Sequence, residues 1–282
     1  MKKIAVIGAG TMGAGIAQIA LEAGCQVNLR DIRDELVEKG VGTIQRFIGR
    51  KLEKGKITKE QYDDILQRLT GTTDLKKALE GTELVVEAVL EKMKLKKEVF
   101  KEMGELCGKN VVLATNTSTL SITEIGSGTN YPERVVGTHF FSPVPLMSLV
   151  EVVKGERTNE ATIKKAVNFC EATGKTPIIV KDIPGFIVNR FLCLLYNEGA
   201  YQVQNRIASK EDIDKGLKLG ANHPMGILEL MDAVGIDVIY YALQSLWEST
   251  KEERYKPCSL FKEMVDTNRI GRKTGEGFYQ YR

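Results

Sequence analysis

The fold is decided by residues 3–13, KIAVIGAGTMG, where an apolar run from Lys3 to Ile7 leads directly into Gly8-Ala9-Gly10-Thr11-Met12-Gly13. The run has the length of a buried strand, and the small residues that follow it to Ala23 predict a helix packed closely on a sheet. A second predicted strand, Gln26–Arg30, ends at Asp31. Strand, glycine turn, helix and strand form a complete βαβ unit, which indicates an α/β fold with a parallel sheet.

Each glycine of the turn has its own physical task. Gly8 permits the tight turn, Gly10 lets a pyrophosphate approach the backbone, and Gly13 lets the helix pack against the strand. The free N–H groups and the dipole at the helix start, where Thr11 and Met12 lie, attract phosphate charge. The sequence therefore predicts a dinucleotide at these five residues; a simple tight turn is the alternative.

Asp31 lies 23 residues after Gly8, near the spacing of an acid that binds the adenosine ribose. Its charge would repel a 2′-phosphate, which favours NAD over NADP. Arg30 and Arg33 flank it, however, and an arginine can accept that phosphate, so NADP remains the alternative cofactor.

Residues 34–68 are charged and helical in pattern, and predict two helices that split near Gly55-Lys56-Ile57-Thr58, with Thr58 capping the second. Strand signals then resume, with helices expected at 92–106 and 159–173. The predicted strands are Glu83–Glu87, Val111–Thr115, Arg134–His139, Leu149–Val153 and Thr176–Val180. Residues 1–183 should thus form a Rossmann-type, mostly parallel sheet with a helical excursion.

The segment Asp182-Ile183-Pro184-Gly185 marks a break in this pattern. Beyond it no strand is predicted until the last residues, and helices are expected at 186–206, 210–219, 227–231 and 237–248. We therefore expect two domains, a dinucleotide-binding domain at 1–183 and an all-α domain at 184–282.

Composition excludes several other classes. A net charge of +3 is too small to argue for nucleic acid, and no partner of that kind or membrane partner is expected. The five cysteines are scattered and contain no Cys-x-x-Cys pair, so neither a metal site nor a disulfide framework is predicted. Unpaired thiols favour a cytoplasmic location.

His139 is one of only two histidines, and Glu151 follows it by twelve residues within the apolar run 149–153. An acid in such a run is costly unless it is paired. Histidine, with an unperturbed pKa of about 6.5, suits proton transfer, and a carboxylate on its other ring nitrogen would orient it. We predict this pair; the alternative is a core histidine bonded to backbone, with Glu151 on a solvent-facing edge.

Three further polar residues are candidates for the same site. Ser118 follows a predicted strand at its carboxyl end, where ligands of open α/β sheets collect, although serine is also a common helix cap. Asn116 shares that loop and is expected to face the cofactor. Asn189 lies early in an apolar helix, where its amide would donate to a developing oxyanion or tie helix to sheet.

Several long motifs occur in a characteristic order along the whole chain. They are Val85-Val86-Glu87-Ala88 with Glu91, Asn116-Thr117-Ser118-Thr119-Leu120, Gly137-Thr138-His139-Phe140-Phe141-Ser142-Pro143, Leu149-Val150-Glu151-Val152, Pro184-Gly185-Phe186-Ile187-Val188-Asn189-Arg190, Asn222-His223-Pro224-Met225-Gly226, and Lys273-Thr274-Gly275-Glu276-Gly277-Phe278-Tyr279. With them the chain resembles the short-chain L-3-hydroxyacyl-CoA dehydrogenase family, above all its bacterial 3-hydroxybutyryl-CoA dehydrogenases.

The resemblance implies an NAD-dependent oxidoreductase that interconverts (S)-3-hydroxybutyryl-CoA and acetoacetyl-CoA in butyrate or fatty acid metabolism. It also implies a homodimer formed through the C-terminal helices. The catalytic residues that it implies are Ser118, His139, Glu151 and Asn189, of which Ser118 and Asn189 also bind substrate.

The same resemblance places Asp31, Glu91, Lys96 and Lys273 at the cofactor, together with Asn116, Ser118 and Ser142. A solvated charge pair is the alternative for Glu91 and Lys96, and an exposed turn for Lys273. Two positions depart from the family pattern. Ser142 stands where asparagine is usual, which puts a nicotinamide-side hydrogen bond in doubt, and Ser148 stands where lysine is common.

Residues 46–59 carry six basic residues and one acid, and Arg46, Arg50 and Lys54 share one helix face. Coenzyme A carries a 3′-phosphate and a pyrophosphate, which such a face suits, and the family resemblance implies that Arg50 and Lys54 bind it. A merely solvated face is the alternative. Two other functions stay open here, a gulonate-type sugar-acid dehydrogenase and a non-catalytic, crystallin-like dinucleotide-binding protein.

Overall fold

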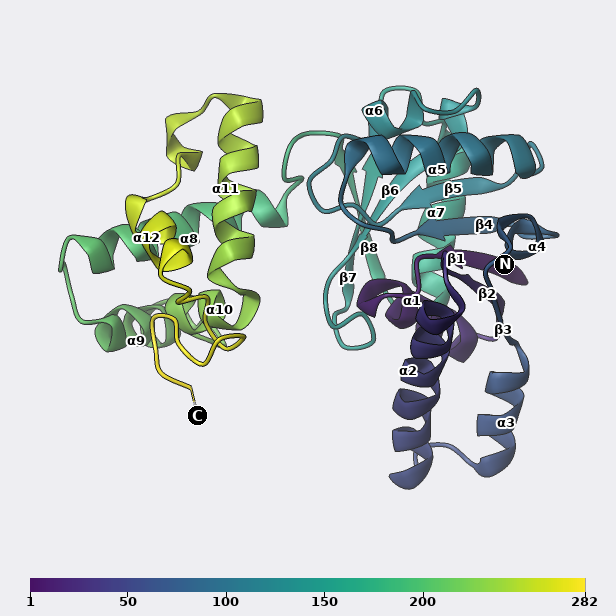
Figure 1. Cartoon of the computed structure of the whole chain (residues 1–282), viewed down its shortest axis with the longest axis horizontal. Helices are drawn as coiled ribbons and strands as arrows, with labels where there is room; N and C mark the ends of the chain where they lie inside the picture. The colour runs from purple at the N-terminus through teal and green to yellow at the C-terminus, as the bar shows by residue number, and fades with distance from the viewer. Residues whose placement is uncertain (282) are drawn as a thin grey trace. The chain divides into compact units, whose positions relative to one another are not determined.

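The computed structural model describes residues 1–281 and divides the chain into two compact units, Met1–Phe186 and the part from Ile187 onward. The first unit is an α/β domain, and the second is built from helices (Figure 1). The predicted fold class, a Rossmann-type sheet with a helical excursion followed by an all-α region, is confirmed.

The first unit contains one eight-stranded sheet of order β3-β2-β1-β4-β5-β6-β7-β8. Its strands are β1 (Lys3–Ile7), β2 (Gln26–Arg30), β3 (Leu69–Thr72), β4 (Leu84–Glu87), β5 (Val112–Thr115), β6 (Val135–Phe140), β7 (Leu149–Lys154) and β8 (Thr176–Lys181). All neighbouring strands run parallel except β6 and β7, which are antiparallel. The strands β7 and β8 therefore start at the edge where the other six end.

Helices cover both faces of the sheet, because alternate strand residues point to opposite sides. In β1, Ile4 and Val6 pack into one apolar cluster, and Ala5 and Ile7 pack into another. The first cluster includes α1 (Thr11–Glu22), α2 (Asp34–Glu53) and α7 (Glu160–Ala172). The second includes α4 (Leu75–Leu79), α5 (Met93–Leu106) and α6 (Ile122–Gly126).

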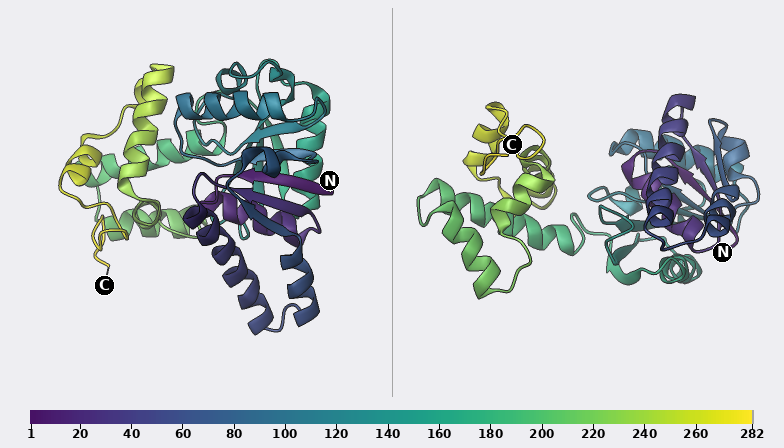
Figure 2. Two further views of the ribbon diagram at one scale, coloured as in Figure 1. Left: turned by 45° about the vertical axis from the view of Figure 1, so that its right-hand side comes forward. Right: turned by 90° about the horizontal axis from the view of Figure 1, so that it is seen from below.

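The helical excursion is a hairpin of α2 and α3 (Lys59–Gln67), which extends away from the sheet in Figure 1 and in the left view of Figure 2. Thr58 caps α3 as predicted. Its side chain accepts a hydrogen bond from the Gln61 backbone N–H at 3.2 Å, and the Gln61 side chain accepts one from the Thr58 backbone N–H at 2.8 Å. This reciprocal box fixes where the second helix begins.

Strand β3 and the helix expected from residue 186 differ from the sequence prediction. Strand β3 was not predicted, because Leu69-Thr70-Gly71-Thr72 is a half-exposed edge strand with little apolar character. The helix expected from residue 186 begins instead at Val188. Gly185 and Phe186 have φ of 76° and 49°, left-handed values that a right-handed helix cannot contain.

Over residues 187–281, the second unit packs five α-helices around its own core. They are α8 (Val188–Gln204), α9 (Lys210–Gly220), α10 (Ile227–Val234), α11 (Ile236–Thr250) and α12 (Ser259–Asp266), the last of which was not predicted. The tail that follows α12 is held by the buried carboxylate of Asp232. This group accepts hydrogen bonds from the backbone N–H groups of Phe278 and Tyr279, each at 2.9 Å.

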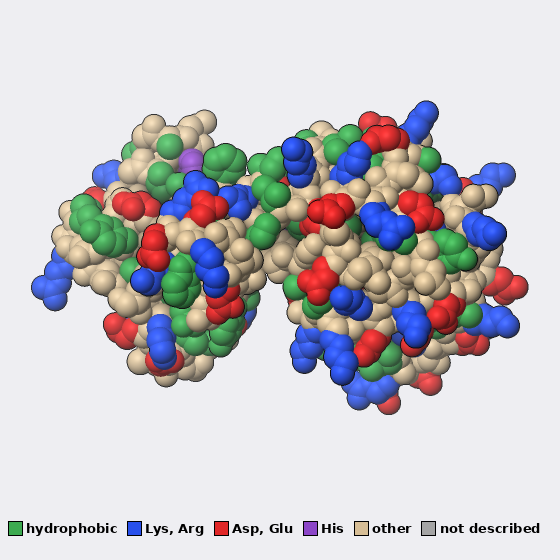
Figure 3. All heavy atoms as spheres, turned by 90° about the horizontal axis from the view of Figure 1, so that it is seen from above, with side chains coloured by type: hydrophobic (Ala, Val, Ile, Leu, Met, Phe, Trp, Pro, Cys, Tyr) green, Lys and Arg blue, Asp and Glu red, His purple; other side chains and the backbone are tan. Residues whose placement is uncertain are grey.

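Figure 3 shows one face of the molecule, on which positive and negative side chains are interspersed over both units. This face carries no large area of a single sign, in keeping with the small net charge of +3. Within residues 1–281, no helix combines the length and the apolar character that crossing a membrane requires.

Candidate active site

The sheet topology brings five predicted site residues of the first unit to one edge. Gly8, Asp31 and Asn116 directly follow β1, β2 and β5, and His139 lies near the end of β6. Because β7 runs the opposite way, Glu151 enters the sheet from this same edge. Ligands of open α/β sheets bind at such a carboxyl edge.

The glycine turn has the geometry that a dinucleotide requires. Gly8 has φ of 105°, and a Cβ at Gly13 would lie 1.7 Å from the Gly8 carbonyl oxygen, so no larger residue fits at Gly13. Within residues 1–281, a Cβ at Gly10 would meet no atom within 4 Å beyond those of its chain neighbours. The first turn of α1 therefore faces open space, into which its free N–H groups can bind phosphate.

Asp31 both supports this turn and faces the adjacent groove. Its carboxylate accepts hydrogen bonds from the backbone N–H groups of Ala9 and Ile32, each at 2.7 Å. Arg30 donates to the Thr73 carbonyl at 3.2 Å, and the exposed Arg33 lies 3.9 Å from Glu35. Both arginines thus have partners of their own, whereas the charge of Asp31 lies directly beside the turn, which fits a ribose with a free 2′-hydroxyl better than a 2′-phosphate.

Beside the glycine turn, Glu87, the last residue of β4, forms a buried ion pair with Lys96. Lys96 and Glu87 are fully buried, and the ammonium of Lys96 lies 2.7 Å from a Glu87 oxygen and 3.3 Å from a Glu91 oxygen. Burial raises the pKa of Glu87, whereas Lys96 and a hydrogen bond from the Thr115 hydroxyl oppose that shift. No role was predicted for Glu87, although an acid that ends a fully apolar strand requires a partner.

Glu91 links this ion pair to the loop that carries Ser118. One carboxylate oxygen accepts hydrogen bonds from the Thr117 hydroxyl and from the Ser118 backbone N–H, the latter at 2.9 Å. Two segments far apart in the sequence are therefore fixed relative to one another. Lys96, buried beneath Glu91, acts on this edge through the carboxylates it pairs with.

His139 and Glu151 lie directly opposite each other on the antiparallel strands β6 and β7. The Nδ1 atom of His139 is 2.7 Å from a carboxylate oxygen of Glu151, and both side chains are buried. An ionised carboxylate can only accept, so the Nδ1 atom carries the hydrogen and Nε2 is the nitrogen that can take a proton. The rings of Phe141 and Phe186 lie 4.4 and 5.8 Å from the imidazole, measured between centroids.

The neighbouring loops are tied to this pair. The side-chain carbonyl of Asn116 accepts a hydrogen bond at 3.0 Å from the backbone N–H of Phe140, the residue after His139. Ser142 lies two residues farther on and is exposed, near the start of the loop to β7. Asn116 and Ser142 thus lie near the carboxyl edge of the sheet. The side-chain carbonyl oxygen of Asn116 bonds to the backbone there.

A groove of about 670 Å³ lies beside the glycine turn, and we call it the α1–α2 groove. Gly10, Thr11 and Asp31 line one part of it, and the loop Pro143–Leu146 forms a wall. From α2 it is lined by Leu36, Lys39, Thr43, Arg46, Phe47 and Lys51. The groove thus joins a dinucleotide turn to a helix with three cationic side chains.

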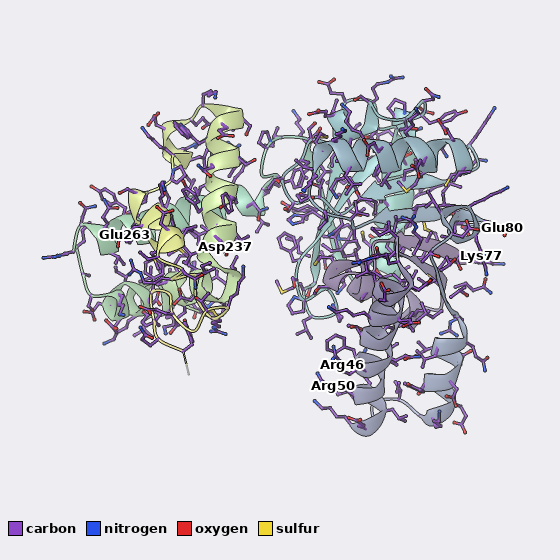
Figure 4. The ribbon with its side chains drawn as sticks, viewed as in Figure 1. Arg46, Arg50, Lys77, Glu80, Asp237 and Glu263 are labelled. Carbon is purple, nitrogen blue, oxygen red and sulfur yellow. The ribbon has the colours of Figure 1, made fainter. Side chains whose placement is uncertain are left out.

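The basic residues of α2 lie partly on one side of the helix, as predicted. Arg46 and Arg50 lie on the same side of α2 (Figure 4), with guanidinium groups 5.4 and 5.6 Å from the centroid of the Phe47 ring. Arg46 lines the α1–α2 groove, as does Lys51, which pairs with Glu22 at 2.7 Å. Arg50 and Lys54 are not among the lining residues, and Lys54 lies just past the end of α2.

The remaining predicted residues belong to the second unit. Asn189 is the second residue of α8. Lys273 lies in the tail, where its ammonium is 2.9 Å from a carboxylate oxygen of Asp237 in the first turn of α11. This ion pair was not visible in the sequence, because 36 residues separate its partners.

A Rossmann-type turn and a buried histidine–carboxylate pair on one sheet edge define a nicotinamide-dependent oxidoreductase. Residues 3–183 match the model of the 3-hydroxyacyl-CoA dehydrogenase NAD-binding domain, and residues 185–281 match that of the 3-hydroxyacyl-CoA dehydrogenase C-terminal domain. The chain belongs to the 3-hydroxyacyl-CoA dehydrogenase family, and the family prediction is confirmed together with its NAD cofactor.

Relatives cover the chain from end to end. It is 41% identical to the probable 3-hydroxybutyryl-CoA dehydrogenase of Bacillus subtilis, over 100% of this chain and 98% of that protein. It is 42% identical to the 3-hydroxybutyryl-CoA dehydrogenase of Clostridioides difficile, over 99% of both chains. The crystal structure of (S)-3-hydroxybutyryl-CoA dehydrogenase from Ralstonia eutropha matches with a TM-score of 0.97 and 40% identity, over 100% of this chain and 99% of that one.

Proposed function

We propose that the protein interconverts (S)-3-hydroxybutyryl-CoA and acetoacetyl-CoA with NAD(H). The observation that carries the proposal is the pair of His139 and Glu151, 2.7 Å apart, at the sheet edge that also holds the glycine turn. Family membership and the names of the relatives support the same substrate.

In the oxidative direction, His139 takes the proton of the substrate's 3-hydroxyl group on Nε2, and Glu151 stabilises the imidazolium that forms. When NAD is bound, it supplies the hydride acceptor. We assign to Ser118 and Asn189 the binding of the substrate oxygen, by a hydroxyl and an amide. Asn116, Ser142, Glu91, Lys96 and Lys273 are assigned to the cofactor side.

Steady-state kinetics across 3-ketoacyl-CoA esters, from acetoacetyl-CoA to a twelve-carbon ester, test this proposal with NADH and with NADPH. We expect the highest kcat/KM with acetoacetyl-CoA and NADH. Competition by free CoA distinguishes this activity from sugar-acid oxidation. Turnover of a sugar acid that free CoA does not inhibit would refute the proposal.

Cofactor choice depends on the charge of Asp31. Asp31→Asn removes the charge and keeps a carbonyl oxygen for one of the two backbone N–H groups, which bond to different oxygens of Asp31. We expect the preference for NADH over NADPH, measured as kcat/KM, to fall at least about tenfold, the worth of one charge-assisted hydrogen bond. Asp34→Asn, an exposed acid three residues later, is the control. An unchanged preference for NADH over NADPH in Asp31→Asn would show that Asp31 does not bind the ribose.

The coenzyme A end is assigned to the basic face of α2, where Arg46 and Arg50 lie on the same side of the helix and Lys54 lies just past its end. We expect Arg50→Glu and Lys54→Glu each to raise KM for acetoacetyl-CoA by about tenfold, since a cation paired with phosphate becomes a repelling anion. KM for acetoacetyl-N-acetylcysteamine, which lacks the nucleotide, should stay unchanged. Lys101→Glu, which changes an exposed residue of α5, is the control. Equal effects on KM for both thioesters would show that α2 does not bind coenzyme A.

We also propose a homodimer formed through the second unit. Its surface exposes large apolar side chains, among them Phe191 at 67%, Leu219 at 76% and Tyr241 at 59%. Exposed apolar area of this kind is typical of protein interfaces.

We also propose a cytoplasmic location. The five cysteines are free thiols, which supports a reducing compartment.

A further inference from the structure

The loop that joins β6 to β7 runs from Phe141 to Ser148 and connects the strands of His139 and Glu151. Its tip, Pro143-Val144-Pro145-Leu146-Met147, is apolar yet mostly exposed, and Leu146 is 77% exposed. Four of these five residues line the α1–α2 groove. Because most of the tip stays exposed, hydrophobic burial contributes little free energy to fixing its position. Other contacts must therefore hold the tip against the groove.

Two contacts anchor this tip. Val144 is 2% exposed and packs on α1 at Gly15, where an added Cβ would lie 2.8 Å from the Val144 Cβ. The second anchor is Lys175, the residue just before β8. Its ammonium donates hydrogen bonds to the carbonyl oxygens of Val144 at 2.6 Å and of Met147 at 2.8 Å. One side chain thus holds both ends of the exposed tip.

Lys175 is an unusual group for such a position. Its side chain is buried, and among residues 1–281 no carboxylate lies within ion-pairing distance of it. Burial lowers the pKa of Lys175, and only Glu22 opposes the shift. Glu22 already accepts hydrogen bonds from Lys51 at 2.7 Å and from Gln18 at 3.1 Å.

A buried cation without an anionic partner costs free energy that an apolar side chain would not. The Lys175 ammonium recovers part of that cost through its bonds to two backbone carbonyls, which a methionine of similar length cannot make. Stability alone therefore does not explain a lysine here. The two carbonyls that Lys175 contacts belong to the loop tip that lines the α1–α2 groove, beside the dinucleotide turn.

We infer that Lys175 is a positioning residue for cofactor binding, which fixes the tip Pro143–Met147 as the wall of the α1–α2 groove. The same tip follows Ser142 and leads into the strand of Glu151, so its position also determines where the nicotinamide-side residues lie. Lys175 acts through the two carbonyls and does not contact the reacting atoms. The kinetic part of the inference depends on the proposed function, whereas its binding part depends only on the family's NAD site.

Lys175→Met tests this inference in the full-length protein. We expect the dissociation constant of NADH, measured by fluorescence titration, to rise about tenfold. Chymotrypsin cleavage at Leu146 or Met147 should become about tenfold faster, because the tip is released. KM for NADH should rise more than kcat falls. Lys175→Arg, whose guanidinium can donate to both carbonyls, should restore NADH binding to within about threefold of the wild type.

The matched control is Lys165→Met. Lys165 also donates from its ammonium to a backbone carbonyl, that of Asn110 at 2.7 Å, but it is exposed and does not line the groove. This variant should bind NADH as the wild type does. Should Lys175→Met fail to fold, Lys175→Gln gives the same readouts with a neutral donor.

Unchanged NADH binding in a folded Lys175→Met variant would overturn the inference, whatever its cleavage rate. So would a loss of binding that Lys175→Arg does not restore. NADH binding and proteolysis require no substrate. A wild-type protein that fails to reduce acetoacetyl-CoA would therefore refute the proposed function and leave this inference testable.

Discussion

We expect His139→Ala to lower kcat at least about a thousandfold while NADH binding stays near the wild-type value, a loss of the size found on removing members of catalytic triads. The imidazole is held on one side by Glu151 at 2.7 Å and is flanked by the rings of Phe141 and Phe186. No other imidazole of the first unit can replace it, because the chain's second histidine is His223. Steady-state kinetics and a fluorescence titration with NADH measure the two quantities.

His223→Ala is the matched control, since it makes the same substitution in the second unit, on the loop before α10. We expect its kcat to stay within about threefold of the wild type, as for most changes outside a site. A His139→Ala enzyme that keeps turnover within about tenfold would show that this residue is not the base.

Glu151→Gln should lower kcat by about a hundredfold to ten-thousandfold, since the amide has nearly the shape of the carboxylate but lacks its charge. A glutamine can also donate to Nδ1, which would favour the tautomer with hydrogen on Nε2, where the substrate proton must go. Glu151 is fully buried, so no solvent replaces the lost charge. The measurement is kcat, together with thermal unfolding to confirm that the variant folds.

The two substitutions should not be additive. If Glu151 acts through His139, the double variant His139→Ala/Glu151→Gln will be about as slow as His139→Ala alone. Glu156→Gln, an exposed acid shortly after β7, controls for the loss of a glutamate. Additive losses would mean that Glu151 contributes independently of the imidazole.

Most of the fold could be predicted because apolar runs and glycine turns are local signals. Strands β1 and β2 have the predicted bounds, Lys3–Ile7 and Gln26–Arg30. The edge strand β3 lacked such a signal, since its partly exposed residues need no apolar side chains. The start of α8 was wrong because the left-handed backbone of Gly185 and Phe186 depends on contacts that a propensity does not include.

The sequence predicted which residues belong to the site, but it did not predict the contacts between them. The spacing of His139 and Glu151 was compatible with two neighbouring strands, but the antiparallel register that places them face to face is a property of the sheet. The bonds of Glu91 to the Ser118 loop and of Lys175 to the Pro143–Met147 tip join segments 27 to 31 residues apart. A pattern in one sequence carries no information on such contacts.

A crystal structure of the protein with NAD⁺ and 3-hydroxybutyryl-CoA tests most directly whether the imidazole of His139, held by Glu151, exchanges the substrate's proton. We expect Nε2 of His139 to lie about 2.6–3.2 Å from the C3 oxygen while Nδ1 keeps its bond to Glu151. A complex in which another side chain holds that oxygen and His139 lies beyond hydrogen-bond reach would contradict it.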